Sequence, residues 1–198
     1  MVYSSRTYTV NVQNFSVALT QFVDVLAKMQ VSAPSTAATT EDGLQQALSF
    51  LRSVQQRDGC VYLIGNGGSA AIVAHMQNDL VNKARLRAHV LHEASLLTCM
   101  SNDYGYDRGY AEILERVLRP DDVLITVSSS GRSKNILNAV EVARLRGAYI
   151  LTLTGFTPEN PLRTCGHVNV WLPSSDYGEV EIGHQLVLHY LADALAAQ

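Results

Sequence analysis

The apolar positions of the chain follow a helical period in its first quarter. Apolar residues recur at helical spacing over residues 15–29 and again over residues 44–54, separated by the small and polar residues 32–40. Gly59 follows the second segment and predicts its end. Two helices ahead of a first strand either cover one face of a sheet or extend to a second subunit. We interpret the aromatic stripe of the first helix as core packing rather than as a ligand site.

Beyond Gly59 the period changes, and short apolar runs rich in β-branched residues alternate with helical segments. The predicted strands are Val61–Ile64, Ala88–Leu91, Val123–Val127, Tyr149–Thr154 and His167–Leu172. The predicted helices are Ala70–Lys83, Glu93–Asn102, Tyr110–Leu118, Lys134–Arg146 and a C-terminal one containing Ile182 and Leu195. This alternation is typical of an α/β fold with a parallel sheet. We expect a flavodoxin-like doubly wound sandwich of five parallel strands, with ligands bound between the first and third of them.

The rest of the chain is organised around residues 61–83. Four apolar residues without alternation predict a strand buried on both faces, and Gly65–Gly68 forms a turn whose backbone can approach a ligand closely. Ser69 is the expected N-cap of the following helix, whose amino end then points at the loop. His75 and Asp79 are four residues apart on that helix and share one face. We expect chemistry on this face.

A second informative stretch follows the third predicted strand. Four hydroxyls surround Gly131 at the start of a helix, and they belong to Ser128, Ser129, Ser130 and Ser133. Hydroxyl donors, backbone N–H groups and a helix dipole together suit a phosphate dianion. Such a loop by itself is equally compatible with an N-cap and a turn. Its position favours binding, because it and residues 66–69 should open onto one crevice.

The C-terminal helix carries further candidate ligands. Glu181 and His189 are eight residues apart, or about 12 Å along a regular helix, which is close to the limit for two side chains that bind one metal. Either Glu181 lies at an irregular helix start or the two residues come from different subunits. The other histidines are interpreted as core or surface residues, and they are His89, His92, His167 and His184.

Composition narrows the class of protein. The 198 residues are 47% hydrophobic and 17% charged, which is enough for one full core, and no apolar run approaches the ~20 residues of a membrane helix. A net charge of -3 gives no electrostatic footprint for nucleic acid. Three dispersed cysteines and an N-terminus without an apolar signal segment indicate a cytoplasmic protein.

Taken together, these motifs resemble the SIS-domain sugar-phosphate isomerases, and within them the sedoheptulose-7-phosphate (phosphoheptose) isomerases. The resemblance runs from about Gly59 to the C-terminus. It rests on the order and separation of Gly65-Asn66-Gly67-Gly68-Ser69, Asn102-Asp103, Ser128-Ser129-Ser130-Gly131-x-Ser133, Leu153-Thr154-Gly155 and the pair Glu181 and His189.

The resemblance implies a set of site residues. Substrate would be bound by Asn66, Gly67, Gly68, Ser69, Asn102, Asp103, Ser128, Ser129, Ser130, Ser133 and Glu181. Zinc or another divalent metal, one per site, would be held by His75, Asp79, Glu181 and His189. Aspartate stands at 79 where the family generally has glutamate, and glutamate at 181 where it has glutamine, so both remain oxygen ligands. Lys83 stands where the family tends to have arginine.

The implied reaction interconverts sedoheptulose 7-phosphate and D-glycero-D-manno-heptose 7-phosphate through a cis-enediol, for lipopolysaccharide or capsule. Asp79 is the expected base, with Glu181 as the alternative, and His189 is the expected acid. The family also implies a homotetramer with shared sites, in which residues 1–58 serve packing and oligomerisation and residues 59–198 form the sandwich of a single SIS domain.

Three other interpretations remain open at this point. The chain could be a non-catalytic SIS module that senses a sugar phosphate or serves as a scaffold for a replication initiator, although such relatives lack the metal-site side chains. It could isomerise another sugar phosphate. A plain nucleotide-binding sheet fits poorly, because both the three-glycine fingerprint and the phosphate-loop lysine are absent.

Overall fold

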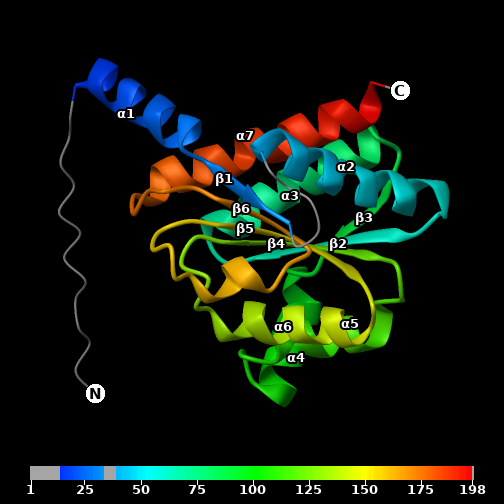
Figure 1. The fold of residues 1–198 in the computed structure, drawn as a ribbon. Coiled ribbons are helices and arrows are strands. Elements are labelled where there is room, and N and C mark those ends of the chain that lie inside the picture. Colours follow the sequence, from blue (N-terminus) through cyan, green and yellow to red (C-terminus); the bar gives the residue numbers. More distant parts are fainter. Residues whose placement is uncertain (1–13, 34–38, 198) are drawn as a thin grey trace, which may run out of the picture.

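The computed structural model describes residues 14–33 and 39–197 and shows a sheet between two layers of helices (Figure 1). Its strands are β1 (Gln30–Ser32), β2 (Cys60–Gly65), β3 (Arg87–Val90), β4 (Val123–Ser128), β5 (Tyr149–Thr154) and β6 (Val168–Trp171). Its helices are α1 (Phe15–Ala27), α2 (Thr40–Gln56), α3 (Gly68–Asn82), α4 (Ala94–Tyr104), α5 (Gly109–Val117), α6 (Lys134–Leu145) and α7 (Tyr177–Ala196), with a short 3₁₀ turn at Pro161–Thr164. The predicted doubly wound α/β class is confirmed.

The strand order of the sheet is β1-β6-β5-β4-β2-β3. The five strands from β2 to β6 are parallel, as predicted, and the order reverses between β2 and β4, so the switch point lies where the sequence placed it. A sixth strand was not predicted. Residues 30–32 pair antiparallel with β6, in a stretch that the hydrophobic pattern assigned to the end of a helix and a polar break.

Alternate residues along the strands point to opposite faces of the sheet. Val61, Leu63 and Ile125 pack with α2, α3 and α7 on one face, whereas Ile64, Leu124 and Ile150 pack with α5 and α6 on the other. Each face is covered, which is why the strands read as continuous apolar runs. Within the described residues no helix combines the length and apolarity that a bilayer span requires.

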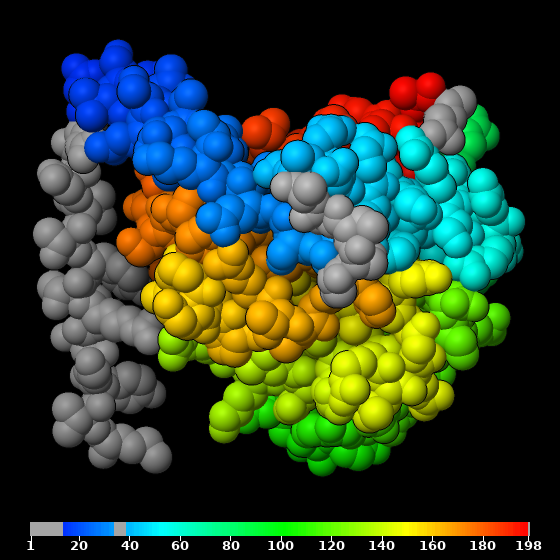
Figure 2. Space-filling model, in the orientation of Figure 1, coloured from blue at the N-terminus to red at the C-terminus, as the bar shows by residue number. Residues whose placement is uncertain are grey.

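The first helix, α1, is not part of the core, although the sequence pattern predicted that it would be. None of the residues of α1 is buried, and Phe15, Leu19 and Val23 are 80%, 51% and 56% exposed. Figure 2 shows α1, in dark blue, projecting from the body of the molecule. The core interpretation of its aromatic stripe is therefore wrong within one chain, whereas α2 does contribute to the core through Leu48, Leu51 and Val54.

Candidate active site

The glycine turn after β2 shapes the start of α3. Gly67 is the N-cap and has a φ of +55°, a conformation that glycine adopts without strain, and its cap has no side-chain hydrogen bond. Ser69 already lies inside the helix and is buried, so its predicted role as N-cap is wrong. A Cβ on Gly65 would lie 2.7 Å from the backbone of Ser69, so this position also requires glycine.

Side chains from α5, from α6 and from the loop before α5 fix this turn. The amides of Asn66 and Asn135 exchange two hydrogen bonds of 3.0 and 2.9 Å, and the Tyr106 hydroxyl donates to Asn66 Oδ1 at 3.0 Å. Tyr110, which is buried, donates to the Gly65 carbonyl at 2.8 Å. Sequence reasoning missed these supporting residues, because Asn135 lies 69 positions from Asn66 and no local pattern joins them.

The serine loop after β4 is also built on a glycine that the fold requires. Gly131 has a φ of +61°, and a Cβ there would collide with the Asn160 side chain, which donates to the carbonyls of Ser129 and Gly155. The Ser129 hydroxyl is buried without a hydrogen-bond partner among the described residues. Ser133 is the N-cap of α6, and its side chain makes no capping hydrogen bond. The Ser133 hydroxyl is therefore available to a ligand, whereas the Ser129 hydroxyl is an unpaired donor among the described residues and is enclosed within the loop.

Both loops line one cavity of about 240 Å³. Asn66, Gly67, Gly68 and Ser69 form one wall, and Ser128, Ser129, Ser130 and Ser133 form another, with Tyr177 and Glu181 added from α7. The Glu181 carboxylate sits against Gly68, where a Cβ would lie 2.4 Å from its Oε1. Tyr177 was not predicted. The structure thus brings the two predicted binding loops together at the switch point.

A second group of side chains lies further along the same two helices. One ligand atom from each of His75, Asp79 and His189 falls within 4.8 Å of the other two. Asp79 Oδ2 lies 2.9 Å from His189 Nδ1 and 3.8 Å from His75 Nε2, and the two imidazole rings are 4.8 Å apart. Two imidazole nitrogens and one carboxylate oxygen are a donor set typical of a catalytic zinc site with an open position.

Lys83 lies next to this group. Its ammonium is 3.2 Å from Asp79 Oδ2 and 3.0 Å from Asp193 Oδ1. The hydrogen bond to Asp193, followed by that to Asp79, raises the pKa of Lys83 above its usual value. Asp79, which is buried, is therefore held from two sides, by a cation and by an imidazole.

Glu181 is not part of the metal-type group within one chain. Because α7 is helical from Tyr177 to Ala196, it offers no irregular start that would bring Glu181 to His189. The alternative of an irregular helix start is therefore wrong, and within one chain Glu181 lines the cavity with the serine loop instead of joining His189.

Asn102 and Asp103 lie away from the cavity lining. They are exposed in the last turn of α4, where Asn102 Nδ2 donates to Asp103 Oδ1 at 3.0 Å. His184, in contrast, is a core residue, as expected. It is fully buried, its Nε2 lies 2.9 Å from the Thr154 carbonyl, and burial lowers its pKa to about 4.

A family model described as SIS domain matches residues 25–155. The chain belongs to the SIS domain family. Within this family it is 32% identical to a phosphoheptose isomerase of Helicobacter pylori, over 78% of this chain and 83% of the relative, and 33% identical to one of Yersinia pestis, over 76% and 80%. A solved phosphoheptose isomerase from Francisella tularensis superposes on the SIS chain with a TM-score of 0.78 at 25% identity, covering 93% of this chain and 95% of that one. The resemblance drawn from the motifs is thereby confirmed.

Proposed function

We propose that this SIS protein is an aldose–ketose isomerase that interconverts sedoheptulose 7-phosphate and D-glycero-D-manno-heptose 7-phosphate. Its relatives named phosphoheptose isomerase support the reaction class. The hydroxyl-lined cavity supports binding of the phosphate, and the group of His75, Asp79 and His189 supports proton transfer.

The observation that carries the proposal is the separation of these two parts of the site. Ser69 and Asp79 are ten residues apart on α3, or about 15 Å along the axis, and Glu181 and His189 are about 12 Å apart on α7. The two helices pack against each other. A phosphate in the cavity would leave its sugar chain to extend along both helices towards Asp79, which favours a long sugar phosphate over a short one.

The metal-type group fits zinc or another divalent ion. His75, Asp79 and His189 would hold it, and the fourth ligand would come from substrate, water or a second subunit's Glu181. When bound, the ion would polarise the substrate carbonyl and stabilise the oxyanion of the enediol.

Proton transfer is assigned to two adjacent residues. The Asp79 carboxylate removes the proton from the carbon next to the carbonyl, which leaves an enediol, and His189 delivers a proton to the neighbouring carbon. The 2.9 Å separation of Asp79 Oδ2 and His189 Nδ1 places both groups beside the same part of the substrate. Glu181 lies against the glycine turn, beside the expected phosphate, so its position favours Asp79 as the base.

Assembly completes the proposal. We assign the protein to the cytoplasm as a homotetramer, in which residues 1–58 contribute to subunit packing and heptose 7-phosphate is made for lipopolysaccharide or capsule. The exposed face of α1 and the exposed residues Ile182, Leu186 and Tyr190 on α7 are surfaces that a second copy would cover. Asn102 and Asp103 remain proposed substrate contacts.

The direct test is incubation of the purified protein with sedoheptulose 7-phosphate, with aldose formation followed before and after treatment with a chelator. We expect turnover that the chelator abolishes and zinc restores. Fructose 6-phosphate is the matched control, because its shorter chain cannot place its reacting carbons as far from the phosphate. Tight binding of the heptose without turnover would instead indicate a sugar-phosphate sensor.

A further inference from the structure

A second and larger cavity lies at the amino ends of the strands, at the opposite end of the sheet from the active site. It has a volume of about 700 Å³ and lies where β2, β3 and β4 begin, as its lining residues Cys60, Arg87 and Asp122 show. Volumes of this size accommodate small organic ligands. The proposed isomerase reaction makes no use of this cavity.

Arginine dominates the charge of the lining. Five arginines face three aspartates, on a chain whose net charge is -3. The arginines are Arg57, Arg87, Arg116, Arg119 and Arg146, and they come from four separate segments of the chain. A cationic cavity on an acidic protein attracts anions by its local field rather than by the charge of the whole molecule.

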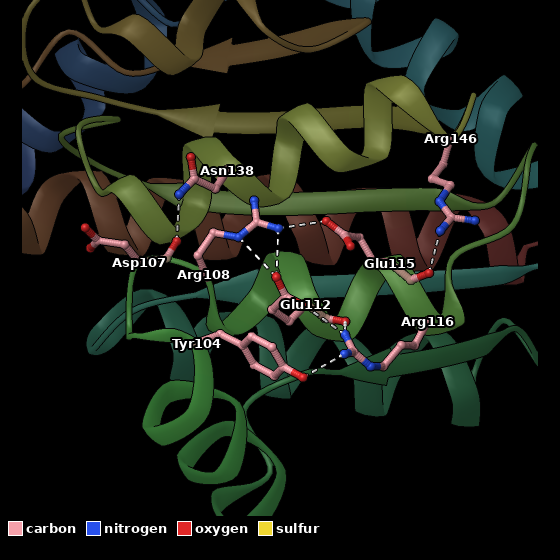
Figure 3. A network of polar contacts seen from close by, with 8 residues as sticks. All are labelled: Tyr104, Asp107, Arg108, Glu112, Glu115, Arg116, Asn138 and Arg146. Atoms are coloured by element: carbon pink, nitrogen blue, oxygen red, sulfur yellow. Dashed lines mark hydrogen bonds and ion pairs between the residues drawn. The ribbon is translucent and has the colours of Figure 1, made fainter.

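Three of the arginines already have carboxylate partners. Arg57 lies 3.5 Å from Asp121, and Arg87 lies 3.7 Å from Asp58. Arg116 pairs at 3.0 Å with Glu112 and also donates to the Tyr104 hydroxyl, as Figure 3 shows. These pairs neutralise each other, so they do not account for the excess of positive charge.

Arg119 and Arg146 carry the excess. Neither guanidinium has a carboxylate within ion-pair distance among the described residues, and Arg146 donates instead to the Glu115 carbonyl at 2.6 Å (Figure 3). The nearby Asp122 carboxylate is occupied by the backbone N–H groups of Cys60 and Arg119, both at 2.9 Å. With the ion pairs set aside, Arg119, Arg146 and Asp122 leave a net charge of +1 beside the cavity, and neither guanidinium has an ion-pair partner among the described residues.

An aromatic ring and apolar side chains complete the lining. Tyr62 donates its hydroxyl to the Val117 carbonyl at 3.2 Å, and Val117, Leu118 and Pro120 also line the cavity. Guanidinium forks bind phosphate oxygens in pairs, and tyrosine and arginine both stack on flat rings. We propose that this cavity is a second ligand site, independent of the isomerase site, and that it binds a nucleoside phosphate.

Part of the arginine cluster has a structural explanation. Arg57 and Arg116 lie at the C-terminal ends of α2 and α5, where a cation interacts favourably with the helix dipole, and each donates to the carbonyl four residues earlier. This role does not extend to Arg119, whose side chain makes no hydrogen bond or ion pair with any described residue. A variant of Arg119 can therefore distinguish ligand binding from helix capping as the role of the cluster.

The experiment measures ATP binding by isothermal titration calorimetry in the intact protein. We expect the double variant Arg119→Gln/Arg146→Gln to bind ATP at least tenfold more weakly, with unchanged isomerase activity. The control Arg144→Gln removes an arginine that is exposed and paired with Glu141 outside the cavity, and it should bind ATP as the natural protein does.

A second pair of variants separates this site from the active site. Ser130→Ala/Ser133→Ala should keep ATP binding while losing affinity for sedoheptulose 7-phosphate. Loss of ATP binding in the serine variant, equal affinity in the arginine variant, or no binding by the natural protein would each overturn the proposal. If the double arginine variant melts at a lower temperature, ATP binding is measured with Arg119→Gln alone, because that side chain has no polar partner to lose. Unchanged affinity in this single variant would then overturn the proposal.

Discussion

Asp79 is the residue on which the proposed chemistry depends most. It is buried, it lies within 3.8 Å of two imidazoles, and Lys83 holds the same oxygen at 3.2 Å. Aspartate is shorter by one methylene than the glutamate that the family resemblance leads us to expect, so its position depends on these contacts.

Asp79→Asn should lower kcat by roughly 10²–10⁴-fold, because the amide cannot accept the substrate proton. Metal content should fall only in part, because the amide keeps an oxygen donor. Glu181→Gln should leave measurable turnover, since it restores the family's usual residue. Kinetics and metal analysis of both variants check this assignment.

Asp193→Asn is the matched control, because Asp193 also contacts Lys83 but is 63% exposed and lies outside the metal-type group. It should keep most of the activity. An active Asp79→Asn beside an inactive Glu181→Gln would move the base to Glu181.

His184 makes stability depend on pH. Burial lowers its pKa to about 4, whereas the unfolded chain has a value near 6.5. The unfolded state therefore binds more protons between these values, and the free energy of unfolding should decrease as pH falls from about 6.5 towards 4, by at most about 1.4 kcal/mol per pH unit from this residue. Urea denaturation of the natural protein and His184→Gln at pH 7 and pH 5 measures the difference. An equal loss of stability in both proteins would assign the pH dependence to other groups.

At the scale of elements, the strand–loop–helix units carry the proposed substrate-binding loops. The hydrophobic pattern predicted each parallel strand, because strands buried on both faces read as unbroken apolar runs. It missed β1, which has three residues of which only Val31 is buried, and which exists because the edge of β6 is available for pairing. It also misplaced the cap of α3, because Gly67, with its positive φ, is the N-cap and lies two residues before Ser69.

The serine loop yields a prediction at this scale. Ser133→Ala should raise the KM for the heptose phosphate roughly tenfold to hundredfold, by removing a charge-assisted hydrogen bond worth about 1.5–3 kcal/mol. The fold should be unaffected, because the Ser133 hydroxyl caps nothing in α6. Steady-state kinetics and a melting curve test both parts. If the KM is unchanged in both Ser133→Ala and Ser130→Ala, the loop is not part of the site.

At the scale of the whole molecule, α1 and α7 expose apolar faces that a single chain does not cover. Leu19 and Val23 are one helical turn apart on α1, and Leu186 on α7 is 51% exposed. Faces of this kind are typical of subunit interfaces.

Leu19→Glu/Val23→Glu should shift the protein from a tetramer to smaller species and reduce activity, because charges would have to be buried between subunits. Light scattering coupled to size exclusion measures the mass. Leu145→Glu is the control, since Leu145 is 72% exposed on α6, on the opposite side of the sheet, and should leave the mass unchanged. A natural protein that is monomeric and active at nanomolar concentration would contradict the proposed assembly.

The sequence by itself determined the α/β class, the switch point and the residues that could serve chemistry, because hydrophobic period and turn glycines are local properties. Only the tertiary structure decided which of these residues meet. It grouped His75 and Asp79 with His189, placed Glu181 against Gly68 instead, and joined Asn66 to Asn135 across the switch point. These juxtapositions depend on how α3 and α7 pack on the sheet, and no spacing along a chain specifies the contact between two helices more than 90 residues apart.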